Sequence, residues 1–251
     1  YQADADLTSK LQPYHDRAKA DAETVIGELK GGDLVPANEV NGIPTAQIQD
    51  TAMIDLINKV QMYYTGAEIS STAMFVPTAN IKEGKIQKAG TALIYPYANT
   101  LYKVEINGKQ LKKYMEWSAN YYNTYKPGDL TISFNQNIRA YNYDMFSGVK
   151  YEVNVSKEPG SRIENLRKMD GTPIKDTDVF IMAVNNYRAS SQLGANGEIY
   201  KAGEAAPKIL EIDVRGDLGG VRELIADYIK NVKGGVISPE LDNNWKLTGI
   251  D

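Results

Sequence analysis

Apolar side chains recur every three or four residues from Leu7 to Leu29, and Lys, Asp, Arg and Glu occupy the positions between them. This spacing predicts an amphipathic helix that Gly31-Gly32 ends. A single amphipathic helix before a Gly-Asp-Leu-Val-Pro stretch is typical of an arm that packs on its own domain or joins two domains. We therefore predict a connector helix over residues 1–31 and one larger domain over residues 32–251.

Three further segments show the helical period. One begins at Asp50, which is a candidate N-cap, and ends at Gly66. A second follows the turn dipeptide Asn107-Gly108 and places Leu111, Tyr114, Met115, Ser118 and Tyr122 on one side. The third runs from Leu218 to Val232 behind Asp217. Each of these helices should bury its apolar side against the rest of the domain.

Shorter apolar runs bounded by turn residues predict strands. They cover residues 68–73, 92–94, 101–106, 131–134, 149–155, 162–167 and 179–184. Helices and strands are interspersed without a strict βαβ rhythm, so the pattern favours a layered α+β fold with mixed sheets over a doubly wound sheet. Residues 185–207 form a long segment rich in Gly, Ala and Ser, and loops of that length in compact domains are usually functional or disordered.

Composition narrows the classes of partner. The 251 residues are 42% hydrophobic and 24% charged, which is ordinary globular composition, and the net charge is −4. Binding to a nucleic-acid polymer leaves a basic footprint, so we expect no such partner, although a mononucleotide needs only local donors. No apolar run approaches the ~20 residues that span a bilayer, so we expect no membrane insertion. Because the chain starts at Tyr1 rather than Met, we expect a processed protein or a fragment.

The residue inventory excludes most catalytic centres from this chain. It contains no cysteine, its single histidine is His15 on the first predicted helix, and it has neither a P-loop nor a dinucleotide-binding glycine motif. Asp242 and most other carboxylates are typical of solvated surface. Asp50 and Asp144 are better site candidates, although helix capping explains Asp50. We therefore predict no catalytic residue, metal site or cofactor within these 251 residues.

Two segments about 90 positions apart carry the chemistry of a binding site. Tyr95–Leu101 reads YPYANTL and Val184–Ser190 reads VNNYRAS. Each places aromatic rings among amides at the edge of an apolar run, which suits the stacking of a planar base and hydrogen bonding to its rim. Together they predict a pocket for a nucleotide or nucleoside.

These segments also carry a family resemblance. Together with residues 104–118, 141–153 and 162–166, in the expected order between about Val25 and Ile229, they resemble the C-terminal domain of the 5'-nucleotidase family. Within that family the likeness is greatest to the bacterial 2',3'-cyclic-nucleotide 2'-phosphodiesterase/3'-nucleotidases. The resemblance implies an exported parent phosphoesterase that is secreted, cell-wall-associated or periplasmic. Its N-terminal metallophosphoesterase domain would hold two divalent metals, and this chain alone would be inactive.

The resemblance also implies roles for individual residues. Matched motif to motif, Tyr97 and Tyr187 would clamp the base between their rings. The remaining candidates for substrate binding are Asn99, Asn186, Arg188 and Phe75, and Arg188 would either contact phosphate or fix its loop. Tyr143 is a third ring near these motifs, and we expect it to pack against a strand.

The sequence departs from the family pattern at two places. Ser190–Gly194 replaces the glycine-rich turn that usually follows the second motif. Ser70–Pro77 contains no arginine, whereas 5'-nucleotidases have an Asn-Gly-Gly-Gly-Ile-Arg phosphate loop there. The second departure favours the cyclic phosphodiesterase/3'-nucleotidase branch. The alternatives are the C-terminal domain of a 5'-nucleotidase, or a non-enzymatic module whose aromatic platform binds a ligand such as a sugar.

Overall fold

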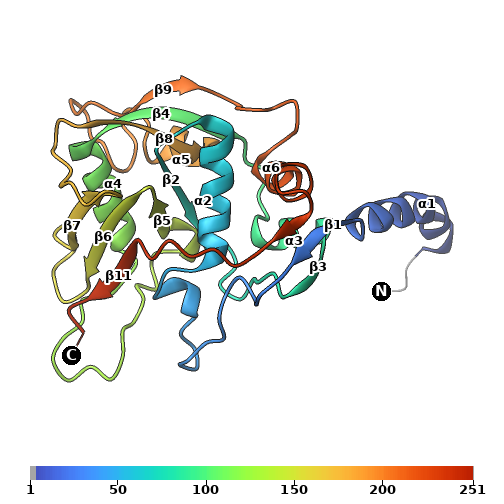
Figure 1. Ribbon diagram of the computed structural model, residues 1–251, viewed down its shortest axis with the longest axis horizontal. Helices are drawn as coiled ribbons and strands as arrows, with labels where there is room; N and C mark the ends of the chain where they lie inside the picture. Colours follow the sequence, from blue (N-terminus) through green and yellow to red (C-terminus); the bar gives the residue numbers. More distant parts are fainter. Residues whose placement is uncertain (1–3, 251) are drawn as a thin grey trace.

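A five-stranded mixed sheet forms the centre of the protein, as shown by the computed structural model, which describes residues 4–250 (Figure 1). The strand order is β5-β2-β8-β4-β9. β2 pairs with β8 in parallel, and the other neighbouring strands are antiparallel. The strands are β2 (Ile69–Ala73), β4 (Leu101–Asn107), β5 (Asp144–Ser147), β8 (Val179–Asn185) and β9 (Lys208–Glu211).

Two three-stranded sheets flank the central one. The first has the order β10-β1-β3 and the second β11-β6-β7. Both combine one parallel with one antiparallel pairing, and in each the parallel partner comes from the C-terminal part of the chain. The strands are β1 (Val25–Leu29), β3 (Gly84–Gln87), β6 (Val149–Asn154), β7 (Ile163–Lys168), β10 (Val236–Ile237) and β11 (Trp245–Thr248).

Helices connect the sheets. α2 (Ala52–Thr65) packs on β2, β5 and β8 of the central sheet, whereas α4 (Gly108–Ala119) contacts both this sheet and β7. α3 (Lys88–Ile94) and α6 (Val221–Asp227) pack on each other beside the β10-β1-β3 sheet, and the short α5 (Asn186–Ser191) follows β8. One buried apolar core runs through all three sheets. The α+β prediction is confirmed.

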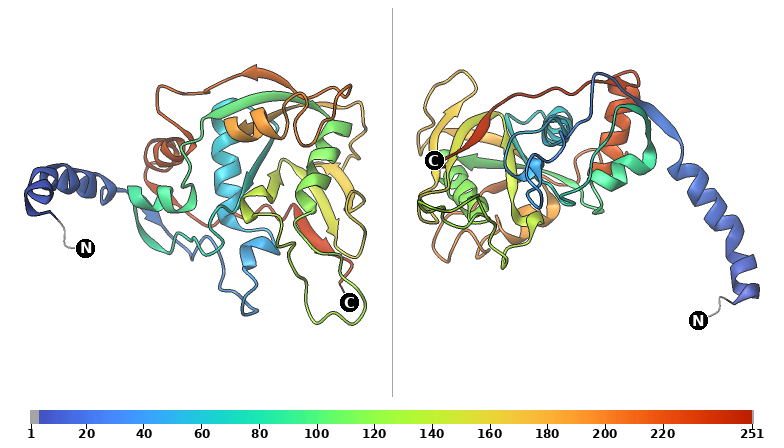
Figure 2. Two further views of the ribbon diagram at one scale, coloured as in Figure 1. Left: turned by 180° about the vertical axis from the view of Figure 1, so that it is seen from behind. Right: turned by 90° about the horizontal axis from the view of Figure 1, so that it is seen from below.

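The first predicted helix is shorter than its sequence pattern indicates. α1 spans Ala5–Ala22, and Val25–Leu29 is strand β1. The prediction of helix beyond Ala22 was therefore wrong, because these β-branched and apolar residues gain backbone partners on β3 and β10. α1 buries none of its residues and projects away from the body in both views (Figures 1 and 2). A connector role for residues 1–31 stays a prediction.

Other boundaries need correction. Residues 92–94 lie in helix α3 rather than a strand, and residues 131–134 form only one isolated bridge, Tyr122 to Phe134. The last helix begins at Val221 behind Gly220, and continues as one π-helical stretch, Tyr228–Val232. At α2 the N-cap is Thr51, so Asp50 is not the cap.

The helix predicted after Asn107 is confirmed, although it ends at Ala119 and Tyr122 lies beyond it. Asn107 Oδ1 accepts from the Gln110 amide and Gln110 Oε1 accepts from the Asn107 amide, each at 2.9 Å, which is a reciprocal capping box. The long segment over 185–207 is not simply a loop, because it contains regular structure and buried side chains. It begins with α5 and then buries Leu193, Ile199 and Tyr200 in the core.

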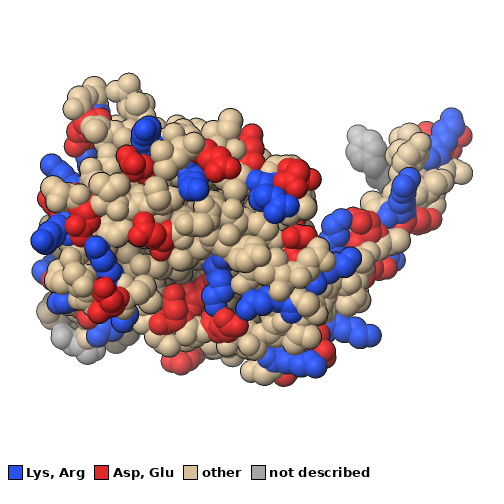
Figure 3. Space-filling model, turned by 45° about the horizontal axis from the view of Figure 1, so that its top comes forward, with Lys and Arg blue, Asp and Glu red and all other residues tan. Residues whose placement is uncertain are grey.

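Charged side chains of both signs are intermixed over the face drawn in Figure 3 and along the projecting helix. This face therefore lacks the continuous basic surface that polymeric phosphates require. Among residues 4–250, no helix combines the length and the apolar character needed to cross a bilayer.

Candidate functional site

Tyr97 and Tyr187 line the same cavity, which has a volume of about 260 Å³. Its other walls are the side chains of Phe75, Asn99, Tyr141, Asn185 and Arg188. This volume is just below the ~300–1,000 Å³ of sites for drug-sized ligands, so the cavity suits one small planar group rather than a dinucleotide.

The pairing of two strands explains why these distant segments meet. β4 and β8 are antiparallel with Leu101 opposite Asn185, so the loop before β4 and the turn after β8 lie at one end of the sheet. Asn186 joins them directly. Its backbone N–H donates to the Thr100 carbonyl at 2.9 Å, and its side-chain oxygen accepts from the Thr100 amide at 3.2 Å. Asn186 thus holds the two motifs together and is not among the cavity-lining residues.

The two candidate clamp rings are accessible. Tyr97 is 43% exposed and Tyr187 is 55% exposed, whereas Tyr143 is 2% exposed and packs in the core as expected. Phe75 supports Tyr97 from the side, with ring centroids 5.2 Å apart and an interplanar angle of 81°. Such edge-to-face packing fixes the orientation of Tyr97 while leaving a ring face free.

Sequence reasoning missed Tyr141 as a wall of the cavity. Its ring lies edge-on to Tyr97, with centroids 6.4 Å apart. Tyr141 precedes β5 in the Tyr-Asn-Tyr-Asp stretch that carried the family resemblance. The structure separates its two tyrosines, because Tyr141 is exposed at the cavity and Tyr143 is buried, and the sequence of the stretch does not show which of them faces the cavity.

Beneath the cavity, Arg188 forms a buried ion pair with Asp144. The Arg188 Nε lies 2.6 Å from Asp144 Oδ2, and both side chains are 2% exposed. Its Nη atoms donate to the Tyr141 carbonyl at 2.8 Å and to Asn142 Oδ1 at 3.2 Å, and its guanidinium lies 4.8 Å from the Trp117 ring centroid. Arg188 therefore ties the turn that carries Tyr187 to the segment that carries Tyr141.

The surroundings of Arg188 favour its charged state. Burial lowers the pKa of Arg188, but the adjacent Asp144 more than offsets this, so the pKa lies above its ordinary value. Tyr114 donates to Asp144 as well, and burial followed by the negative charge of Asp144 raises the pKa of that phenol well above its usual range. Of the two roles considered for Arg188, fixing the loop is the one that these contacts support.

Asn99 and Asn185 supply the amides at the cavity wall. The Asn185 side chain caps α5 by accepting from the Arg188 amide at 2.8 Å. The Asn99 carbonyl accepts from the Val221 amide at 2.9 Å, and a Cβ on Gly220 would come within 2.5 Å of that same carbonyl oxygen. A glycine at this position therefore lets the start of α6 brace the loop that carries Tyr97.

The other sequence candidates lie away from the cavity lining. His15 is exposed on α1, with its Nδ1 3.5 Å from Asp16. Asp50 is buried beside Asp55 and Asp242. Burial, and then the charges of Asp55 and Asp242, raise the pKa of Asp50 to about 8, and burial raises the pKa of Asp55 to about 6.

Comparison with known proteins adds to this geometry. The model of the family described as 5'-nucleotidase, C-terminal domain, matches residues 25–199, which include both aromatic motifs. The chain belongs to the 5'-nucleotidase C-terminal domain family. The matched range starts at the first residue of β1.

Curated relatives of this C-terminal domain are longer phosphoesterases. The trifunctional nucleotide phosphoesterase protein YfkN of Bacillus subtilis is 30% identical over 239 residues, covering 82% of this chain and 15% of the relative. The 2',3'-cyclic-nucleotide 2'-phosphodiesterase/3'-nucleotidase of Haemophilus influenzae is 27% identical, covering 98% of this chain and 40% of the relative. The chain thus spans well under half the length of either.

Solved structures show the same fold. A crystal structure from Staphylococcus aureus, named as a 5'-nucleotidase in complex with alpha-ketoglutarate, matches with a TM-score of 0.77 at 21% identity, over 98% of this chain and 44% of that one. The 5'-nucleotidase precursor of Thermus thermophilus matches with a TM-score of 0.70 at 19% identity, over 97% of this chain and 43% of that one. Both support the α+β architecture of the 5'-nucleotidase C-terminal domain.

Proposed function

We propose that this domain binds the nucleoside part of 2',3'-cyclic nucleotides and 3'-nucleotides by stacking the base between Tyr97 and Tyr187. The observation that carries the proposal is that two half-exposed tyrosines from segments 90 positions apart line one cavity. Aromatic stacking is worth about 1–3 kcal/mol per base and tolerates any base, so base selectivity should be low.

The polar groups of the cavity fit a neutral ligand. Asn99 and Asn185 offer amides at the rim, and the guanidinium of Arg188 is already bound by Asp144, Asn142 and the Tyr141 carbonyl. A phosphate in this cavity would therefore gain little binding energy from Arg188. The domain positions the base and ribose, which leaves the phosphoester to a different part of the parent enzyme.

We propose that the parent is a phosphoric ester hydrolase whose preceding metallophosphoesterase domain holds two divalent metals. Those metals would activate a water and polarise the phosphoryl group. The printed names of the curated relatives support hydrolysis of nucleotide phosphoesters, and the arginine-free Ser70–Pro77 segment supports the cyclic phosphodiesterase/3'-nucleotidase branch. On this account the 251-residue chain alone does not hydrolyse 2',3'-cyclic AMP.

We also propose that the parent acts outside the cytoplasm, at the cell wall, in the periplasm or in the medium. The absence of cysteine is compatible with such a compartment. Fractionation of the source cells, followed by detection of the chain, tests this directly. Recovery with the cytoplasmic fraction would refute it.

Calorimetric titration of the 251-residue chain with adenosine and, separately, with a disaccharide tests the binding proposal. Adenosine should bind and the disaccharide should not, because the cavity holds one planar group. Binding of the disaccharide alone would instead assign the aromatic platform to sugars.

A further inference from the structure

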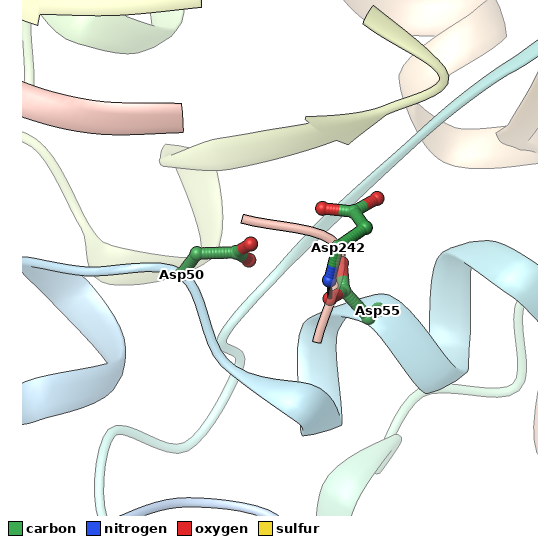
Figure 4. Close-up of side chains that lie close together, drawn as sticks. All are labelled: Asp50, Asp55 and Asp242. Carbon is green, nitrogen blue, oxygen red and sulfur yellow. Dashed lines mark hydrogen bonds between the residues drawn. The ribbon is translucent and has the colours of Figure 1, made fainter. Parts of the chain in front are cut away.

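Three carboxyl groups meet where the C-terminal segment crosses the start of α2, and none of them lines the cavity. One oxygen from each of Asp50, Asp55 and Asp242 lies within 4.8 Å of the corresponding oxygens of the other two. Figure 4 shows the Asp50 carboxylate directed towards the other two. Oxygens that ligate one Ca²⁺ lie no further apart than twice ~2.4 Å, so this spacing allows all three carboxyl groups to reach the same ion.

One of these oxygens is buried without a partner. Asp50 is 6% exposed, and its Oδ1 makes no hydrogen bond within the described residues. Its other oxygen accepts a long hydrogen bond, 3.4 Å, from the Asn244 amide, and the Asp50 side chain also pairs with that of Asp242. A buried carboxylate oxygen without a donor is costly, and a cation in the space that it faces would remove that cost.

Hydrogen bonds hold the carboxylates of Asp55 and Asp242 in place. Asp55 Oδ2 accepts from the Asp242 amide at 2.8 Å, and its Oδ1 accepts from the Ser147 hydroxyl at 3.3 Å. Asp242 Oδ1 accepts from the Asn244 amide at 3.1 Å. Backbone and hydroxyl donors thus orient the carboxylates, while Asp242, which is exposed, leaves one side open to solvent and to water ligands.

Within residues 4–250, no lysine or arginine forms an ion pair with the triad. Lys59 lies near the triad, and its ammonium group forms an ion pair with Glu240. Elsewhere in the core, Asp144 has Arg188, and Glu116 accepts from the Arg162 and Ile163 amides at 2.8 and 2.9 Å. The triad differs from Asp144 because it has no arginine partner, and from Glu116 because three carboxyl groups, rather than one, share the space.

We propose that Asp50, Asp55 and Asp242 bind one divalent cation of the oxygen-preferring class, with Ca²⁺ the best fit, and that the ion fastens the C-terminal segment to the start of α2. Oxygen-only ligands suit Ca²⁺ better than ions that prefer nitrogen or sulfur ligands. This proposal departs from the expectation that the chain holds no metal. It is structural and separate from the proposed hydrolysis, because it joins residues 50 and 242 across the fold.

Thermal melts of the 251-residue chain with and without CaCl₂, after treatment with a chelator, test the proposal. At a hundredfold excess of Ca²⁺ over its Kd, the Tm should rise by about 5–10 °C. Asp242→Asn should abolish the rise, and Asp176→Asn, at an exposed position outside the triad, should keep it. No Ca²⁺ effect at ~10 mM, an equal effect in Asp242→Asn, or an equal effect from NaCl at matched ionic strength would overturn the proposal.

Terbium luminescence gives a readout that does not depend on stability. Trp245 lies three positions from Asp242 and can sensitise bound Tb³⁺. Emission should appear with the wild-type chain, fall as Ca²⁺ is added, and be absent from Asp242→Asn. Emission of equal strength from wild type and Asp242→Asn would place the ion elsewhere and contradict the assignment.

Discussion

Two groups of tyrosines in this domain differ in what surrounds them. Tyr97 and Tyr187 at the cavity are about half exposed. Tyr122 and Tyr143 lie in the core, where the Tyr143 hydroxyl donates to the Tyr122 hydroxyl at 2.7 Å and the Tyr143 ring stacks on Tyr121 with centroids 5.1 Å apart. Residue type alone therefore does not separate the cavity rings from the core rings, which differ in exposure and in hydrogen bonding.

The largest effect should come from removing a core ring. Tyr122→Ala empties a site that is 1% exposed and leaves the Gln47 carbonyl, which accepts from this hydroxyl at 2.5 Å, without its donor. The free energy of unfolding should fall by about 3–5 kcal/mol in urea titration. If Tyr122→Ala unfolded at the same urea concentration as wild type, the contrast between the two groups of rings would fail.

Breaking the ion pair beneath the cavity should cost a similar amount. Arg188→Met leaves the Asp144 carboxylate buried and uncompensated, so stability should drop by about 3–5 kcal/mol. The double variant Arg188→Met/Asp144→Leu should regain most of that loss, because both charges are removed together. Equal stability of the single and double variants would show that Asp144 does not depend on Arg188 for its charge balance.

The cavity rings should show the opposite behaviour. Tyr187→Ala should weaken adenosine binding by about 1–3 kcal/mol in calorimetry, while Tyr187→Phe should be nearly neutral because the stacking face is kept. Stability should change little in either variant.

Tyr63→Ala is the matched control, since Tyr63 on α2 is 56% exposed and does not line the cavity. It should bind adenosine as the wild type does. An equal loss of affinity in Tyr63→Ala and Tyr187→Ala would mean that exposed tyrosines affect binding without forming a clamp.

The smallest expected effect concerns the phosphate. Because Arg188 is engaged by Asp144, adenosine and 3'-AMP should bind the 251-residue chain within about twofold of each other, with little dependence on salt. Tenfold tighter binding of 3'-AMP at low salt would instead place a phosphate contact in this domain.

Local patterns predicted the parts of the fold that local contacts decide. The period of residues 50–66 and the Asn107-Gly108 signal predicted α2 and α4 because the apolar face of each helix, the Gly66 end of α2 and the Asn107 cap of α4 are local features of the sequence. Val25–Leu29 looked helical and became a strand because its partners, β3 and β10, come from distant parts of the chain. Pairing of that kind has no signature in the segment itself.

The candidate site shows the same division between what local sequence predicts and what tertiary packing decides. The motifs containing Tyr97 and Tyr187 were visible in the sequence, and the β4–β8 register brings them to one cavity. Tyr141 and the acidic triad were not predicted, because their neighbours are set by tertiary packing. Asp242 looked like solvated surface in sequence, and only the path of the C-terminal segment places it against Asp55.

A crystal structure of the 251-residue chain with adenosine tests the central claim most directly. The account predicts the base between Tyr97 and Tyr187, with each ring plane about 3.5 Å from the plane of the base. Phe75 and Tyr141 should keep their edge-on positions around Tyr97. Adenosine bound elsewhere, or bound in this cavity without contact to either ring, would contradict the clamp.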